Sequence, residues 1–261
     1  MLAMFRTLRR HRDLLYMLSR RDITVKYKQS IMGFLWAILM PLLITSAGVV
    51  VKLAMTAASG KGGMFREVLP VAIKAAPWAF FVASIRFSTQ SLSNNHNLVT
   101  KIAFPRAVFP LSSVASQLFD FAIASLVILL LVLFAPVPAT VHLLWVPVLL
   151  ALLVAQVVGL ALLLSAANLF FRDVKYLVEV ILTFAVFFTP VFYSVDIFGS
   201  RGKLLLLNPV APILEGLDAT IVRGTHPDAA WTGYAAGWAV LLLLVTPAIF
   251  QALEPKFAES V

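Results

Sequence analysis

The apolar residues of this chain fall in continuous runs of roughly 20 or more, and no other feature constrains the fold as strongly. As a helix, a run of that length crosses the ~30 Å hydrocarbon core of a bilayer. Of the 261 residues, 61% are hydrophobic and only 13% are charged, a balance unlike that of a water-soluble domain. The sequence therefore predicts an all-α integral membrane protein.

Six transmembrane helices follow from the positions of these runs and of the polar or proline-rich turns between them. The stretch from Val195 to Asp228 is too long for a turn and too polar for a span. Its two short apolar pieces, around Leu204–Leu207 and Pro212–Ile221, suit re-entrant or interfacial helices on the far side, and the alternative is a plain loop outside the membrane. Residues 31–253 are predicted to form one transmembrane domain, followed by a polar tail at 254–261. The predicted spans are about 31–58, 69–92, 108–134, 143–170, 176–193 and 231–250.

The first 30 residues form a basic segment in front of the first span. They hold eight Arg or Lys against two Asp, with Leu14, Leu15 and Leu18 at helical spacing. This pattern is typical of an amphipathic helix at the membrane interface. It does not fit a cleavable signal peptide, because the charge is spread over the whole segment and no cleavage site follows a short apolar core.

The short connections that carry Lys and Arg set the orientation. The N-terminal segment, Lys101 with Arg106, Arg172 with Lys175, and Lys256 all fall on one face, which is therefore predicted to be cytoplasmic together with both termini. The opposite face also carries some Lys and Arg, so the bias depends mainly on the N-terminal segment. Because the basic residues lie where anionic lipid headgroups would meet them, the net charge of +9 does not indicate nucleic acid.

The sequence lacks the residues for several kinds of chemistry. It has no Cys, and its four His form no metal-binding pair. The phosphate-binding pattern G-x-x-x-x-G-K-[ST] is absent, so the chain is not expected to hydrolyse nucleotide. Acidic residues are scarce in the spans, with Asp120 placed at one end of the third and Glu179 near the start of the fifth, which counts against proton coupling. Energy for any active transport would enter from a partner.

Several short motifs stand at characteristic places relative to the predicted spans. Together they resemble the membrane subunits of type-2 ABC exporters, specifically those for O-antigen, capsular polysaccharide or teichoic acid. The motifs are Arg20-Arg21-Asp22-Ile23 through Lys26-Tyr27-Lys28, Gly33-Phe34-Leu35-Trp36-Ala37 with Pro41, Asn97-Leu98-Val99 with Lys101, Phe104-Pro105-Arg106, Phe171-Arg172-Asp173-Val174, Thr189-Pro190-Val191-Phe192-Tyr193 and Leu207-Asn208-Pro209.

The resemblance implies a non-catalytic permease of the cell inner membrane. Such a subunit forms a homodimer, docks two copies of a separate ATPase and opens a path for a lipid-linked glycan. It holds no cofactor of its own, because ATP and Mg bind to the ATPase. One alternative is a type-2 ABC permease for a drug or another lipid. A second is a membrane enzyme acting on lipids or sugars, for which the expected cluster of Asp, Glu or His at a membrane face is absent.

The resemblance also assigns the loop from Asn94 to Arg106, and the N-terminal helix, to contact with the ATPase. A short polar helix closed by Pro105 suits docking in a cleft of a soluble partner. The alternative is that Lys101 and Arg106 only anchor the cytoplasmic face. The coupling residues predicted on this basis are Arg20, Arg21, Asn94, Asn97, Lys101, Phe104, Pro105, Arg106, Arg172 and Asp173.

The path itself is expected to be lined by aromatic side chains, over which a sugar polymer can slide. The alternative is that these aromatics lie at the interface or pack against lipid. Arg86 falls inside the second span, where it faces the conduit or the dimer seam, or else extends to the cytoplasmic surface. The segment Val195 to Asp228 resembles the cap of the exit, which Glu215, Asp218 and Arg223 would face unless they are simply solvated. The lining candidates are Trp36, Trp78, Phe81, Arg86, Phe188, Phe192 and Tyr193.

Overall fold

The computed structural model describes residues 9–28, 64–101, 104–135 and 137–258, with a few isolated positions before residue 51. The predicted first span, about 31–58, lies almost wholly outside these residues, and so does Trp36. All regular structure in the described ranges is helical. The predicted helical class is thereby confirmed, while the count of six spans stays a prediction.

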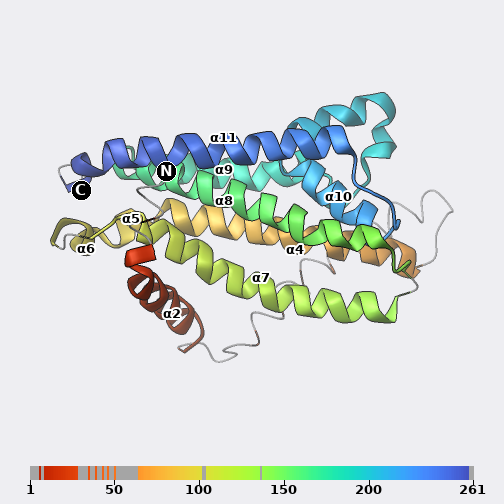
Figure 1. Cartoon of the computed structure of the whole chain (residues 1–261), viewed down its shortest axis with the longest axis horizontal. Coiled ribbons are helices and arrows are strands. Elements are labelled where there is room, and N and C mark those ends of the chain that lie inside the picture. The colour runs from red at the N-terminus through yellow and green to blue at the C-terminus, as the bar shows by residue number, and fades with distance from the viewer. Residues whose placement is uncertain are drawn as a thin grey trace.

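In the described ranges, four long apolar helices run side by side along the molecule (Figure 1). They match the predicted second, third, fourth and sixth spans, and the third to the residue. Each is long and apolar enough to cross a membrane, which makes this a multi-pass membrane protein. The helices are α4 (Met64–Thr89), α7 (Val108–Phe134), α8 (Trp145–Phe170, after the 3-10 turn η1, Val141–Leu144) and α11 (Ala229–Leu253).

The fifth predicted span is shorter than expected. Helix α9 (Val174–Ala185) continues only into the 3-10 turn η2 (Val186–Phe188), and Thr189 is extended. Pro190 explains the stop, because a proline pushes the preceding residue out of the helical region. A helix of 12 residues rises only about 18 Å, which is less than the hydrocarbon thickness. The segment 189–193 therefore belongs to the connection that follows, and the predicted end at Tyr193 is wrong.

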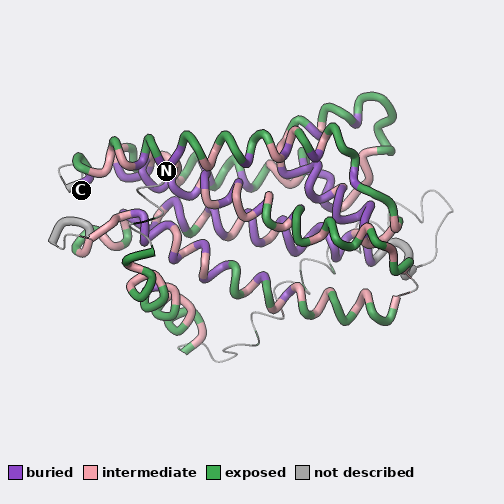
Figure 2. The backbone as a smooth tube through the Cα atoms, viewed as in Figure 1, coloured by how far each residue is buried: buried purple, intermediate pink, exposed green. Residues whose placement is uncertain are grey.

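The connection from α9 to α11 contains a short helix inside the bundle. The 3-10 segment η3 (Val195–Leu207) bends at Gly199, where φ is +55°, and α10 (Ala211–Ile221) follows. Nine of the 11 residues of α10 are buried. It packs between α4, α8 and α11, where Figure 2 shows a continuous buried stretch. The second predicted apolar piece coincides with α10 and the first forms the end of η3, while their assignment as re-entrant helices stays a prediction.

The short polar helices gather at one end of the bundle, here called the inner end (Figure 1). They are α2 (Arg12–Lys28), α5 (Ser91–Asn94) and α6 (His96–Lys101), and the 3-10 turn η4 (Glu254–Ala258) after α11 lies at the same end. Leu18 is buried and Leu14 and Leu15 pack beside it, which confirms the apolar side predicted for α2. The opposite end, with η3 and the start of α11, is the outer end.

The C-terminal segment is more than the polar tail that its charges predicted. Phe257 is fully buried, with its ring 5.1 Å from that of Phe250 and 5.8 Å from that of Phe170. Burial of this aromatic residue among charged neighbours helps to bind the segment to the inner end of the bundle.

Candidate functional site

A polar pocket lies at the inner end, between the loop after α4 and the turn from α8 to α9. Its volume is about 400 Å³. Asn168, which is only 2% exposed, joins the two sides: its Nδ2 donates to Ser93 Oγ (3.0 Å) and its Oδ1 accepts from the backbone N–H of Lys175 (3.0 Å). The lining residues are Gln90, Ser93, Asn94, His96, Asn168, Leu169, Arg172 and Lys175.

This pocket brings together two of the predicted coupling residues, Asn94 and Arg172, from parts of the chain about 80 positions apart. No carboxylate is among its lining residues, whereas Arg172 and Lys175 are cationic, so the pocket suits an acidic group. Asp173 lies next to it and is exposed. The sequence prediction missed Asn168. The signal that could have indicated it is the presence of an amide side chain in the last turn of a largely apolar span.

Helix α2 is fastened to the same inner surface. Arg21 Nη2 donates to Asp22 Oδ1 (2.8 Å) and to Asn95 Oδ1 (3.3 Å). Asp22 in turn accepts from Ser112 Oγ of α7 (3.3 Å). Arg20 is exposed. The basic residues of α2 thus join the loop after α4 in one surface, to which the pocket also belongs.

The segment Phe104 to Arg106 shapes this surface from within. The Phe104 ring lies 5.4 Å from that of Phe109, and Phe104 and Pro105 are both partly buried. The backbone N–H of Arg106 donates to Glu254 Oε1 and its Nη1 donates to the Glu254 carbonyl, both at 2.8 Å. Arg106 therefore fixes η4 against the loop. Asn97 is exposed, and the Lys101 side chain lies outside the described residues.

A second set of contacts joins α2 to the middle of α7. Asp120 pairs with Lys26 and accepts from the Tyr27 hydroxyl, and Lys26 Nζ also lies 3.4 Å from Gln117 Oε1. Asp120 is the thirteenth of the 27 residues of α7, so its predicted place at one end of the span is wrong. Burial and the neighbouring Asp120 carboxylate raise the pKa of Tyr27, which keeps its hydroxyl a donor.

Arg86 and Glu179 form a bidentate ion pair between α4 and α9. The guanidinium Nε lies 2.8 Å from Glu179 Oε2, and Nη2 lies 2.7 Å from Oε1. Both side chains are more than 40% exposed in the single chain. In hydrocarbon such a pair needs water or protein around it, so this face of α4 and α9 suits a wet path or a subunit seam. The sequence showed both charges but not their pairing.

The aromatic candidates separate into two groups. Trp78 and Phe81 stack on each other at 5.5 Å and are at most 9% exposed, so they belong to the core of the bundle. Phe188 is 65% exposed, while Phe192 and Tyr193 are partly buried at the turn after α9. Of the predicted lining aromatics that the structure describes, these last three are the ones outside the core of the bundle.

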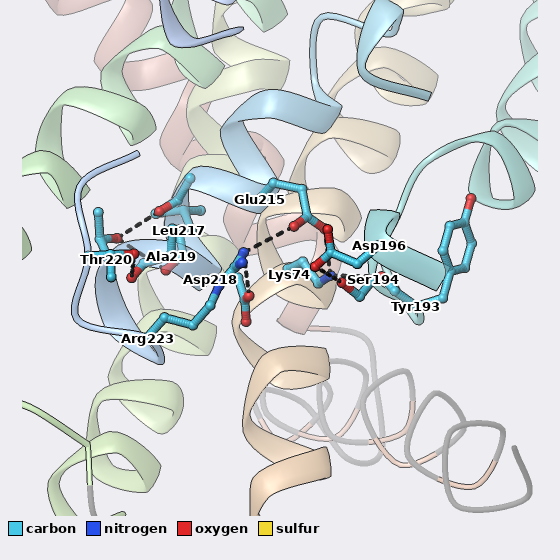
Figure 3. Close-up of polar contacts among 12 residues, drawn as sticks. Lys74, Tyr193, Ser194, Asp196, Glu215, Leu217, Asp218, Ala219, Thr220 and Arg223 are labelled. Atoms are coloured by element: carbon cyan, nitrogen blue, oxygen red, sulfur yellow. Dashed lines mark hydrogen bonds and ion pairs between the residues drawn. The ribbon is translucent and has the colours of Figure 1, made fainter. Parts of the chain in front are cut away.

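At the outer end, polar contacts fix the start of α10. Asn208 Nδ2 donates to Thr189 Oγ1 (2.8 Å), which joins two of the motifs in the sequence. Gln156 of α8 is 1% exposed, and its Nε2 donates to the Pro209 carbonyl (3.2 Å) and to the Ala235 carbonyl (3.0 Å). Glu215 and Asp218 of α10 and Arg223 just beyond it form an ion-pair network with Lys74 of α4 (Figure 3). The alternative that these three are simply solvated does not hold, because all three are ion-paired and the two carboxylates are largely buried.

Comparisons with known proteins agree along the chain. A family model described as the ABC-2 type transporter matches residues 13–222. The O-antigen export system permease protein RfbA of Myxococcus xanthus is 29% identical over 269 aligned positions, which cover 100% of both chains. A Klebsiella pneumoniae protein of the same name is 28% identical over 251 positions, covering 95% of this chain and 94% of its own length. A second one from that organism is 28% identical over 253 positions.

Proposed function

This chain belongs to the ABC-2 type transporter family as a non-catalytic membrane permease, and from that premise we propose that two copies of it form the path by which a lipid-linked polysaccharide leaves the cytoplasm. ABC-2 permeases pair with ATPase subunits. Here two ATPase copies bind ATP and Mg and drive the export, at the cell inner membrane, with both termini of the permease cytoplasmic. The relatives named as O-antigen permeases over their full length support this cargo over a drug.

The observation that carries the proposal is the composite surface at the inner end. Three segments far apart in sequence meet there: α2, the loop with α5 and α6, and the turn from α8 to α9. The surface carries exposed cations from two of these segments, Arg20 and Arg21 on α2 and Arg172 at the polar pocket. A surface assembled from three elements can transmit the movement of a docked motor to α4, α7 and α9 together. The loop with α5 and α6 connects α4 to α7, the turn after α8 leads into α9, and α2 packs against α7.

Two features support a path through the bundle. Helix α10 is too short to cross a bilayer, yet it is buried among helices that do. Backbone that starts or ends at membrane depth must be enclosed by protein or line a wet cavity, so we assign α10 as a re-entrant helix at the exit. The exposed Arg86–Glu179 pair and Phe188 lie on or beside α9, and we assign that face to the path.

Charge reversal at the inner surface tests the docking. A Lys101→Glu, Arg172→Glu variant, reconstituted with the ATPase, is expected to lose export by at least about tenfold, since like charges across an interface repel. ATP turnover by the ATPase alone should not change. Arg106 is left intact because its replacement would also break its contacts with Glu254. A loss of export could then reflect a folding defect instead of lost docking.

The matched control is Arg201→Glu, which reverses an exposed charge at the outer end. It is expected to export like the parent. Equal export by the double variant and the parent would contradict the assigned docking surface. For the cargo, the measurement is surface glycan in a host whose own O-antigen permease is deleted, and a host that stays without surface glycan would contradict the polysaccharide assignment.

A further inference from the structure

Lys74 is a charged residue buried within the apolar part of α4. It lies five residues after Leu69, where that apolar stretch begins, and is 3% exposed. Its Nζ donates to Glu215 Oε1 of α10 (3.1 Å) and to the Tyr193 carbonyl (2.9 Å). One ammonium group thus ties α4 to the turn after α9 and to the middle of α10 (Figure 3).

The acidic residues of α10 also pair with a second cation, Arg223, which follows α10 in the chain. Arg223, just beyond the end of α10, lies 3.3 Å from Glu215 Oε2 and 3.0 Å from Asp218 Oδ2. Its side chain is 45% exposed, whereas that of Lys74 is 4% exposed. Arg223 would stay with Glu215 and Asp218 if α10 moved as a unit. Lys74 is the partner that α10 would leave behind.

The energetics of a buried pair favour a positional role for Lys74. Taking an ammonium and a carboxylate out of water is costly, and well-packed apolar residues of similar size are often as stabilising or more so. A buried pair can instead specify one arrangement among several similar ones, because only one position satisfies both charges. The apolar surfaces of α4 and α10 would tolerate many relative positions of the two helices. Lys74 can reach both Glu215 and the Tyr193 carbonyl in only one of these positions.

The beginning of α10 is held separately from its middle. The contacts of Asn208 with Thr189, and of Gln156 with the Pro209 carbonyl, fix the chain just before the helix. Past the end of α10, Gly224 adopts φ +64°, a conformation that glycine takes without strain. The segment therefore has a fixed base at Asn208–Pro209 and an ion pair with α4 about two turns further along.

We infer that Lys74 is a positioning residue, which holds α10 against α4 and must separate from Glu215 before α10 can swing outward about its base. The inference rests on the proposed function only in treating the outer end as the exit. The movement would carry the α10 carboxylates and Arg223 together toward the outer surface.

The absence of Cys from the chain allows a direct test. Thr220 is fully buried near the outer end of α10, so a Thr220→Cys substitution reports on its exposure to a membrane-impermeant maleimide added from outside. In the complete permease–ATPase complex, Lys74→Met is expected to raise the labelling rate about tenfold, because buried sites react through the open state. Lys74→Arg, which keeps the cation, should label at nearly the parental rate.

The matched control is Lys203→Met, the same change at an exposed lysine of the outer end. It should leave labelling unchanged. Equal labelling of the parent and Lys74→Met overturns the inference, and so does an equal rise in Lys203→Met. If Lys74→Met does not assemble, the double variant Lys74→Met, Glu215→Leu removes both charges and is again expected to label about tenfold faster. Parental labelling of that variant also overturns the inference.

This experiment is independent of transport, since labelling of the resting complex needs neither ATP hydrolysis nor glycan. Fast labelling of Lys74→Met without glycan export by the parent would leave the role of Lys74 standing and refute the proposed cargo. Normal glycan export by the parent, together with unchanged labelling of Lys74→Met, would support the proposed cargo and refute the role of Lys74.

Discussion

Gly159→Leu is expected to separate α8 from α11 and to leave little folded protein. A Cβ atom at position 159 would lie 2.6 Å from Leu242 Cβ and 3.2 Å from the Leu242 carbonyl carbon of α11. Backbone cannot yield as a flexible side chain can, and α8 and α11 form the most extensive helix pair among the described elements. Overpacking of a core lowers the free energy of unfolding by about 1–3 kcal/mol. A leucine side chain forced against backbone is expected to lower it by at least that much.

The measurement is the thermal unfolding midpoint of the purified permease in detergent. Gly159→Ala, with the smallest possible Cβ, should still lower it by several degrees, at about 2–4 °C per kcal/mol for a chain of this size. The matched control is Gly237→Ala on α11, where an added Cβ meets nothing within 4 Å. Because alanine favours a helix over glycine by about 0.5–1 kcal/mol, that variant should unfold at the same temperature or higher. An unchanged midpoint in Gly159→Leu would contradict the close packing of these two helices.

Asp120→Ala is expected to release α2 from α7. The carboxylate holds both Lys26 and Tyr27, and its loss leaves the Lys26 ammonium without its main partner halfway along a membrane helix. Hydrogen bonds to charged groups contribute about 1.5–3 kcal/mol, so release of α2 should become at least about tenfold more frequent. Trypsin reports this directly, because Arg20 and Arg21 are exposed on α2 but cannot be cleaved while the segment stays helical and docked.

The expected result is tryptic cleavage within α2 at least about tenfold faster than in the parent, together with reduced coupling to the ATPase. Asp13→Asn is the control on the same helix. Asp13 is 89% exposed, and its ion-pair partner among the described residues is the exposed Arg12, at 3.7 Å, so its change should not affect cleavage. If Asp120→Ala is cleaved at the parental rate, α2 is held to the bundle mainly by Leu18 and its apolar neighbours, and the expected role of Asp120 is contradicted.

The sequence alone determined the class of the protein and most of its long helices. Runs of apolar residues have a minimum length in a bilayer, and charge and proline mark where they stop, so α7 and α8 could be placed within a residue or two. The short motifs were also sufficient to identify the family. The fifth span was misjudged because its apolar composition continues past Pro190 while the helix does not.

Tertiary structure decided which polar residues meet. Hydropathy places a residue along the membrane normal and within its own helix, but it carries no information on which helix lies alongside. The partners of Lys74, Arg86 and Asp120 are therefore not readable from their own segments, although each pair now accounts for a charge that the bilayer would otherwise exclude. Helix packing chose these partners, and it gathered three distant segments into the surface at the inner end that we assign to the ATPase.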